Sequence, residues 1–444
     1  MALKNNFIIA VGFLLWILLV PDFTESNEST SGPVLTPDIN STQLEILPAE
    51  STGLTLQECY RLALKRSETV AIQKEIIKEA EGRFWRSLSG ALPKVAYEIN
   101  ETRQDGSGAT NFTLSRIPER KFTLSQPLFS GFKEFAAIAA SRAERRQRTQ
   151  EYIRAQQLLF IDVSDAFYFL LSYQKDLEAV DNQKQALLER VDELRKREEL
   201  GRSRISEVAT ARARLSRLEA EIELTKSQAQ VGFQLLEFLT GTKVDSLKED
   251  STAASFSQNK EDYLKKVDQR PDVIAAKEAL EVSRKEVVIA RAGFFPEVSL
   301  DGNYYDERVG NAADVRWDVL FSVKVPIFQG GENVGKVKEA RSLAKQQDLQ
   351  LSSVRRSALL EIENNFTRWQ AAVRRVAALQ KAFKDSQESY NFQKEDYSHN
   401  LVNNLDVLQA LEEMEDVHRD LISIQNESQR LYSDLLVSTG EILQ

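Results

Sequence analysis

The feature that most constrains the fold is residues 132–199, a run that contains neither proline nor glycine. Apolar residues recur there at spacings of three and four: Leu170, Tyr173, Leu177, Val180, Leu187, Val191 and Leu194. This spacing predicts one helix with a coiled-coil seam. At 1.5 Å per residue, the helix would be about 100 Å long. It is too long for a compact globular core and favours a tube wall, a stalk or a spacer.

A reversal of the chain is predicted at Gly201, because glycine suits the left-handed residue at which a helix stops. A shorter helix should then return to Gly241, with Ser203 or Ser206 as its cap. Its apolar positions continue the seam: Leu215, Leu218, Ile222, Thr225, Ala229 and Leu236. The two helices are therefore expected to form a long hairpin.

Two strands are predicted before this hairpin. A helix over 54–92 should end at Pro93, which cannot continue it. Alternating apolar residues then mark a first strand, at Val95, Tyr97 and Ile99, and a second, at Phe122, Leu124 and Leu128. Strands of about ten residues are long enough to cross a membrane when tilted.

The same order of elements returns in the second half of the chain. Three pairs of turn residues are each 199 positions apart: Pro127 and Pro326, Gly131 and Gly330, Gly241 and Gly440. This offset predicts a tandem duplication in which each repeat has a helix, two strands, a long helix and a short helix. The predicted segments are a first repeat at 54–241, a connector at 242–260 and a second repeat at 261–441.

The boundaries of elements in the second repeat are predicted from its proline and glycine residues and from its alternating apolar residues. A helical segment is expected from Asp262 to Gly293, and the Arg270-Pro271-Asp272 run inside it resembles a helix start. The last strand is expected to begin at Trp317 and to continue to Ile327.

The N-terminal residues have the pattern of a targeting segment. Lys4 precedes an apolar run from Phe7 to Val20, which is short for a membrane span and typical of a secretory signal. We predict a signal peptide at 1–24, with an uncleaved anchor as the alternative. Residues 25–53, rich in Ser, Thr, Pro and Glu, are predicted to be a disordered leader.

Composition excludes several functional classes. The net charge of −9 argues against nucleic acid as a partner. A local basic run indicates a solvated helix face or a contact with anionic head groups: Arg142, Arg145, Arg146, Arg148 and Arg154. One cysteine, Cys59, and two histidines argue against an internal disulfide and a zinc site. No catalytic motif stands out, so we expect neither an enzyme nor a bound cofactor.

Four strands cannot close a barrel, since even eight leave room only for side chains. An open sheet in lipid would leave unpaired edges. If the strands span a membrane, several copies must share one barrel, and three copies would supply twelve strands. The alternative is two ordinary hairpins in a soluble bundle, which does not explain the matched strand pairs.

The chain resembles the outer-membrane efflux protein family, the TolC-like exit ducts of Gram-negative bacteria. The resemblance covers roughly residues 54–440 and rests on short sequence motifs, two at the strand–helix junctions and two at the helical turns. At the strand–helix junctions stand Pro127-Leu128-Phe129-Ser130-Gly131 and Pro326-Ile327-Phe328-Gln329-Gly330. At the helical turns stand Gly201 to Ala211 and Asn400 to Ala410.

The resemblance implies a mainly α fold with membrane β-strands, assembled as a homotrimer. The trimer would have a twelve-stranded β-barrel in outer-membrane lipid and an α-helical barrel in the periplasm. The tip of this tunnel would meet a periplasmic adaptor and an inner-membrane pump or exporter of the RND or ABC type.

The resemblance also implies roles for single residues. The pore constriction would contain Asp406 and Gln409, and the tip latch would contain Ser206, Glu207 and Tyr397. The helical turns that meet the adaptor would contain Gly201, Arg202, Asn400 and Leu401, and the strand–helix junctions would contain Pro127, Gly131, Pro326 and Gly330. Two positions depart from the family pattern: Gln409 stands where a second acid is usual and Val402 where a basic latch residue is usual. Asp406 has a second interpretation, as an acid that favours the start of a helix.

The predicted function is a passive outer-membrane exit duct for efflux or secretion. A periplasmic adaptor and a coiled-coil scaffold are the alternatives. An adaptor would carry one hairpin flanked by small β-domains, and a scaffold would need neither a signal peptide nor strand pairs.

Overall fold

The computed structural model describes residues 53–105, 114–249, 259–310 and 312–442. The signal peptide predicted at 1–24 and almost all of the leader predicted at 25–53 lie outside these residues. Part of the predicted connector at 242–260 also lies outside them.

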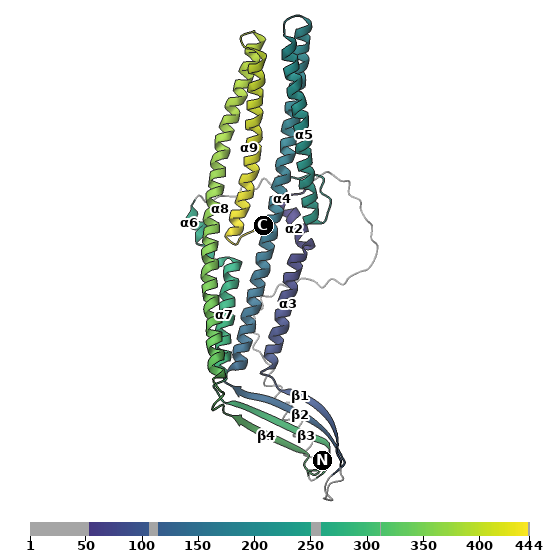
Figure 1. The fold of residues 1–444 in the computed structure, drawn as a ribbon, viewed down its shortest axis with the longest axis vertical. Coiled ribbons are helices and arrows are strands. Elements are labelled where there is room, and N and C mark those ends of the chain that lie inside the picture. The colour runs from purple at the N-terminus through teal and green to yellow at the C-terminus, as the bar shows by residue number, and fades with distance from the viewer. Residues whose placement is uncertain (1–52, 106–113, 250–258, 311, 443–444) are drawn as a thin grey trace, which may run out of the picture. The chain divides into compact units, whose positions relative to one another are not determined.

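Two long helices run along the helical part, and α7 and α9 pack against both of them (Figure 1). Helix α4 covers Lys133–Glu199 and helix α8 covers Glu332–Ser398, with 67 residues each. Their first residues are 199 positions apart, which is the offset seen in the sequence. Each long helix turns back into a shorter one, α5 at Ile205–Thr240 and α9 at Asn404–Ser438. The prediction of a continuous helix over 132–199 is confirmed.

The remaining helices are shorter: α2 at Leu56–Arg66, α3 at Glu68–Ser89, α6 at Lys260–Leu264, a 3₁₀ turn at Val267–Gln269 and α7 at Pro271–Ala292. The prediction of one helix over 54–92 was wrong. The chain breaks at Ser67, whose hydroxyl accepts a hydrogen bond from the Val70 N–H at 3.3 Å and so starts a new helix. The second repeat breaks at the corresponding place, where Pro271 begins α7.

Four antiparallel strands form one sheet in the order β1-β2-β3-β4. They cover Lys94–Arg103, Arg116–Ser130, Glu297–Arg308 and Trp317–Lys324. The last strand ends before the predicted Ile327. Its only partner, β3, begins at Glu297, which pairs with Lys324, so no strand faces the residues beyond. Strands β1 and β4 are open edges.

One face of the sheet is apolar. Tyr97, Phe122, Tyr304 and Trp317 are paired in register across the four strands, and the ring centroids of Tyr97 and Phe122 are 4.6 Å apart. The next level on this face is formed by Val95, Leu124, Gly302 and Val319. Trp317 and Val319 are more than half exposed, at 59% and 52%. This face has no covering layer within the described part of the chain.

The opposite face of the sheet is polar. The Ser125 hydroxyl donates to Asp301 at 2.6 Å, and Asn303 and Tyr305 each donate to the Asp318 carboxylate at 2.8 Å. The two faces therefore differ in chemistry as the two sides of a barrel wall would.

Three apolar clusters hold the helices together along their length. The first surrounds Phe160, which is fully buried and packs edge-on against Tyr60 at 5.1 Å. Cys59 lies in this cluster, and burial raises the pKa of its thiol to about 12. The cysteine is therefore a packing residue with little thiolate character.

None of the helices within the described ranges is long and apolar enough to span a membrane.

The strand-to-helix junction provides a test of packing. Gly131 has φ +64°, and a Cβ there would lie 2.9 Å from Ala292. Gly201 has φ +69° with open space around it. Both Gly131→Ala and Gly201→Ala should lower the free energy of unfolding by roughly 1–2 kcal/mol, because alanine is strained in the left-handed conformation. Gly131→Ala should lower it by about 1–3 kcal/mol more, because the new methyl group would overpack the contact with Ala292.

Thermal unfolding followed by circular dichroism in detergent measures both variants. Equal melting temperatures for the two alanine variants would contradict the close packing of Gly131.

Candidate functional site at the two helical turns

The two helical hairpins reverse direction through the same backbone conformation. Gly201 and Asn400 have φ +69° and +59°, the left-handed conformation that ends a helix. The Arg202 N–H donates to the Arg197 carbonyl at 2.7 Å, and the Leu401 N–H donates to the Asp396 carbonyl at 2.9 Å. Asparagine tolerates this conformation better than most residues with a side chain.

Asp406 closes the second turn. The Asn403 side chain accepts from the N–H groups of Leu405 and Asp406, and the Asp406 carboxylate accepts from the Asn403 N–H at 3.0 Å. This reciprocal arrangement is a capping box. Asp406 therefore has the helix-start role, while Gln409 is exposed one turn further along α9.

The first turn is closed differently. Helix α5 begins after Arg204, which makes no side-chain cap, so the prediction of a cap by Ser203 or Ser206 was wrong. The Ser203 hydroxyl instead donates to the Glu207 carboxylate at 2.6 Å. Ser206 is exposed. Within the first turn, the Glu207 carboxylate is therefore held by a hydroxyl four residues earlier in the chain.

Tyr397 connects the two hairpins. Its side chain is only 6% exposed. The guanidinium carbons of Arg190 and Arg197 on α4 lie 3.9 and 4.5 Å from the centroid of its ring. Two cations over one aromatic ring at these distances form a cation–π clamp between α8 and α4.

Arg190 is the centre of this clamp. It is buried, and its Nε donates to the Asn404 side chain at 2.9 Å, while another nitrogen lies 2.7 Å from Glu193. A second arginine, Arg214 on α5, donates to the Leu408 carbonyl at 2.7 Å. Polar contacts from the first hairpin therefore hold the start of α9.

The sequence prediction placed Tyr397 in the latch but missed its arginine partners. Arg190 and Arg197 follow the spacing of Leu187 and Leu194, so all four share one stripe of α4. Arginine at a seam position of a coiled coil is unusual. That irregularity was the available signal.

The strand–helix junctions are the other predicted positions. Pro127 lies at a register shift between β2 and β3, where its missing N–H costs no regular ladder bond. Pro326 follows the end of β4. Gly131 and Gly330 both have positive φ and precede the long helices.

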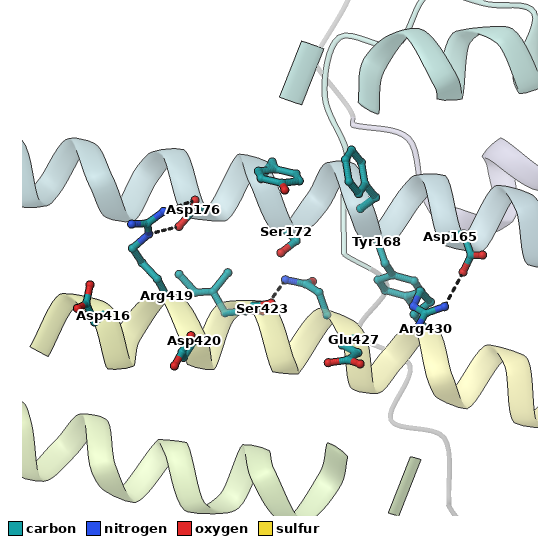
Figure 2. Close-up of a pocket in the computed structure, with 14 residues that line it drawn as sticks. Asp165, Tyr168, Ser172, Asp176, Asp416, Arg419, Asp420, Ser423, Glu427 and Arg430 are labelled. Atoms are coloured by element: carbon teal, nitrogen blue, oxygen red, sulfur yellow. Dashed lines mark hydrogen bonds and ion pairs between the residues drawn. The ribbon is translucent and has the colours of Figure 1, made fainter. Parts of the chain in front are cut away.

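Below the turns, α4 and α9 line an open pocket of about 840 Å³ (Figure 2). Arg419 forms two bonds to Asp176, at 2.6 and 3.0 Å, and also bonds Glu221. Arg430 donates to Asp165 at 3.1 Å. The described residues contain no cluster of His, Cys, Asp and Glu that could hold a metal ion. Ion pairs therefore bridge α4 and α9 across this pocket.

Glu415 is a buried acid at the upper end of this pocket. Its side chain is 9% exposed, and the ion-pair contact that the described residues make with it is His418, at 3.9 Å. Burial raises the pKa of Glu415 to about 7, and burial also lowers the pKa of His418. His418 in turn stacks on Phe383 at 4.5 Å. Burial therefore favours the neutral form of both groups.

Comparison with known proteins identifies the family. The sequence profile described as "Outer membrane efflux protein" matches residues 60–242 and 265–441, which is most of the chain. This chain belongs to the outer membrane efflux protein family. The predicted resemblance is confirmed.

Individual family relatives match over most of their length. Outer membrane protein TolC of Vibrio cholerae is 24% identical over 409 residues, which cover 87% of this chain and 91% of the relative. The alkaline protease secretion protein AprF of Pseudomonas aeruginosa is 22% identical, over 90% of this chain and 85% of the relative.

Two solved channels share the fold. The outer membrane protein VceC from Vibrio cholerae has a TM-score of 0.75 at 21% identity, over 88% of this chain and 97% of that one. The CmeC outer membrane channel of Campylobacter jejuni has a TM-score of 0.72 at 18% identity, over 92% and 94%. The predicted fold class, mainly helical with four strands, is confirmed.

Glu415 generates a pH prediction. Its pKa is about 7 in the folded chain against an ordinary value of 4.5, so the folded state binds the proton more strongly. Stability should therefore fall as pH rises from about 4.5 to 7 and then level off. Since one pKa unit corresponds to about 1.4 kcal/mol, the loss should be on the order of 3 kcal/mol.

Glu415→Gln mimics the protonated acid and should remove this part of the pH dependence. Thermal melts at several pH values compare it with the unmodified protein. Asp434, whose pKa burial raises to about 6, is present in both proteins and cancels in the difference. Parallel pH profiles would contradict a buried neutral Glu415.

Proposed function

We propose that the protein is a passive exit duct of the Gram-negative outer membrane, in which three copies share one barrel. Membership of the outer membrane efflux protein family supports the location and the function class. The observation that carries the proposal is the sheet itself, with one apolar face, one polar face and two open edges.

The sheet argues for shared assembly. In lipid, every backbone N–H and C=O needs a partner, because no water is present to replace it. Strands β1 and β4 each leave one side unpaired within the chain. Pairing β4 of one copy with β1 of the next would satisfy both edges and close a ring. The Leu124 face would then contact lipid, and the Asp318 face would line the lumen.

The helices argue for a tunnel. Long hairpins that continue from a barrel would extend it by on the order of 100 Å. An adaptor protein is less consistent with the chain, because the duplicated hairpins and strand pairs fit a duct. A coiled-coil scaffold would not require a sheet with one apolar and one polar face.

The partners proposed are a periplasmic adaptor and an inner-membrane pump or exporter of the RND or ABC type. The turns at Gly201, Arg202, Asn400 and Leu401 are exposed and would meet the adaptor. Relatives are named for protease secretion and for cation efflux, so the family accommodates different cargoes.

The tip would be the constriction. Asp406 would contribute three carboxylates around the axis, with Gln409 beside them, and such a ring favours cations. Tyr397, held by Arg190 and Arg197, would belong to the latch. Ser206 and Glu207 would contribute from the neighbouring turn.

Adjacent positions on β2 test the duct. Leu124→Lys places a charge on the apolar face, which costs about 2–4 kcal/mol at the bilayer midplane. Thr123→Lys is the matched control on the polar face. Outer-membrane fractions should contain a heat-sensitive trimer for the unmodified protein and Thr123→Lys, and little of it for Leu124→Lys. A soluble, monomeric unmodified protein would refute the proposal.

Asp406 tests the constriction. Asp406→Asn should weaken cation selectivity and block by divalent cations in planar bilayers, because the carboxylate ring is lost. Asn403→Ala removes the cap but retains the charge, and the cap alone is worth about 1 kcal/mol. Single-channel recordings compare the two. Unchanged selectivity in Asp406→Asn would restrict Asp406 to its capping role.

A further inference from the structure

Two ion pairs connect α4 to α9 at equal intervals. Arg419 on α9 bonds Asp176 on α4, and Arg430 on α9 bonds Asp165 on α4 (Figure 2). Positions 165 and 176 are eleven residues apart on α4, as are 419 and 430 on α9. At 1.5 Å per residue, each interval is about 16 Å long. The two ion pairs therefore mark the ends of one section of the seam between these helices.

The open pocket of about 840 Å³ lies in this section. Its lining contains Phe169, Ser172 and Tyr173 on α4 and Ser423 and Asn426 on α9. Pockets that hold small molecules commonly have volumes of about 300–1,000 Å³. In the described part of the chain, no His, Cys, Asp and Glu residues are grouped so that they could hold a metal ion. The pocket therefore has room for a small organic molecule, and its side chains decide which kind.

The α4 side of the pocket is aromatic. The ring centroids of Phe169 and Tyr173 are 4.8 Å apart in an edge-on arrangement, and Phe169 is 36% exposed. Tyr168 lines the pocket as well. The face of an aromatic ring carries partial negative charge and attracts cations placed over it, and its apolar area packs against other rings. This side of the pocket therefore favours a flat organic cation over a compact inorganic ion.

The α9 side of the pocket is acidic. Asp416, Asp420 and Glu427 line it, and their spacing of four and seven residues places them on one face of the helix. The two arginines of the pocket are already bound in the ion pairs to α4. Glu427 lies 3.8 Å from Arg375 on α8. Asp416 and Asp420 form no ion pair with any described residue, so the pocket has negative charge that a cationic ligand would complement.

A buried amide also lines the pocket. Asn426 is only 2% exposed. Its Nδ2 donates to the Ile422 carbonyl at 2.8 Å, one turn earlier on α9, and its Oδ1 accepts from none of the described residues. A buried acceptor without a donor costs free energy, which a ligand that supplies an N–H would recover. The pocket thus offers a hydrogen-bond acceptor as well as negative charge.

We propose that this pocket binds an amphipathic organic cation of drug size. The flat apolar part of the ligand lies against Phe169 and Tyr173. Its positive charge lies toward Asp416 and Asp420, and an N–H of the ligand donates to the Oδ1 of Asn426. An anion of the same shape is repelled by the carboxylates.

This inference goes beyond the passive duct proposed above. The pocket lies within one chain, so it does not depend on how copies assemble. A duct that carries this pocket in every copy would retain organic cations and would not retain anions of the same size.

Binding of a fluorescent dye tests the pocket. Acridine orange is a flat tricyclic cation, and fluorescein is an anion with a similar tricyclic ring system. The anisotropy of each dye is measured during titration with the purified protein in a neutral detergent. Acridine orange should bind with a single saturable phase, and fluorescein should not bind.

Two variants separate the charge from the rings. Asp416→Asn combined with Asp420→Asn should weaken acridine orange binding by roughly tenfold or more, because both unpaired carboxylates are lost. Phe169→Leu retains apolar volume but removes a ring, and it should weaken binding by about threefold to tenfold. The control is Asp385→Asn combined with Glu388→Gln, which makes the same change of net charge at exposed positions of α8 outside the pocket. Binding should be unchanged in the control.

Each outcome decides the inference. Weaker binding in both pocket variants, with the control unchanged, supports the site. Equal weakening in the pocket-acid variant and the α8 control overturns it, since net charge alone would then explain the binding. Unchanged binding in both Phe169→Leu and Tyr173→Leu overturns the aromatic contact and the ligand class. Magnesium chloride that displaces the dye where sodium chloride of equal ionic strength does not would reassign the pocket to a metal ion.

The proposed function is judged separately. A trimer on unboiled gels that binds no acridine orange overturns the pocket and leaves the duct. Unmodified protein that binds the dye in this pocket but forms no trimer overturns the duct and leaves the pocket.

Discussion

The unpaired backbone of the two edge strands is the constraint on which the architecture depends. A four-stranded sheet with an apolar face cannot stand alone in lipid, because the N–H and C=O groups of β1 and β4 would lack partners on one side. Closing the sheet on itself is impossible with four strands. The remaining solution is to share the barrel among copies, and every helix that continues from a strand is then placed around the same axis.

The helical seams show a second consequence of building a tube from hairpins. Apolar clusters hold the hairpins together along their length, and near the tip Arg190, Arg197 and Tyr397 add cation–π contacts to the apolar packing across the seam. Cation–π contacts and hydrogen bonds are directional, so they fix one arrangement of the helices. They also leave buried polar groups when broken, which makes the join between hairpins more sensitive to substitution than an apolar one.

Much of the fold could be predicted from local sequence. The long helices follow from their spacing of apolar residues, and the duplication follows from the offset of 199 between turn residues. The break at Ser67 was missed because serine is common both at caps and inside surface helices. The end of β4 was missed because it depends on where β3 begins. The partners of Tyr397 could not be found from sequence, since Arg190 and Asn404 meet only after two hairpins pack.

The two repeats resemble each other more in backbone structure than in side-chain contacts. Asp406 and Glu207 occupy the same place in the two repeats, yet Asp406 accepts from the backbone of Asn403 and Glu207 accepts from the Ser203 hydroxyl. Asn404 and Tyr397, which hold the seam within the chain, correspond to Ile205 and Glu198, which cannot reproduce the clamp. A ring of three copies would thus have only three-fold chemistry at its tip. In such a ring, the carboxylates that narrow the opening would come from one repeat of each copy.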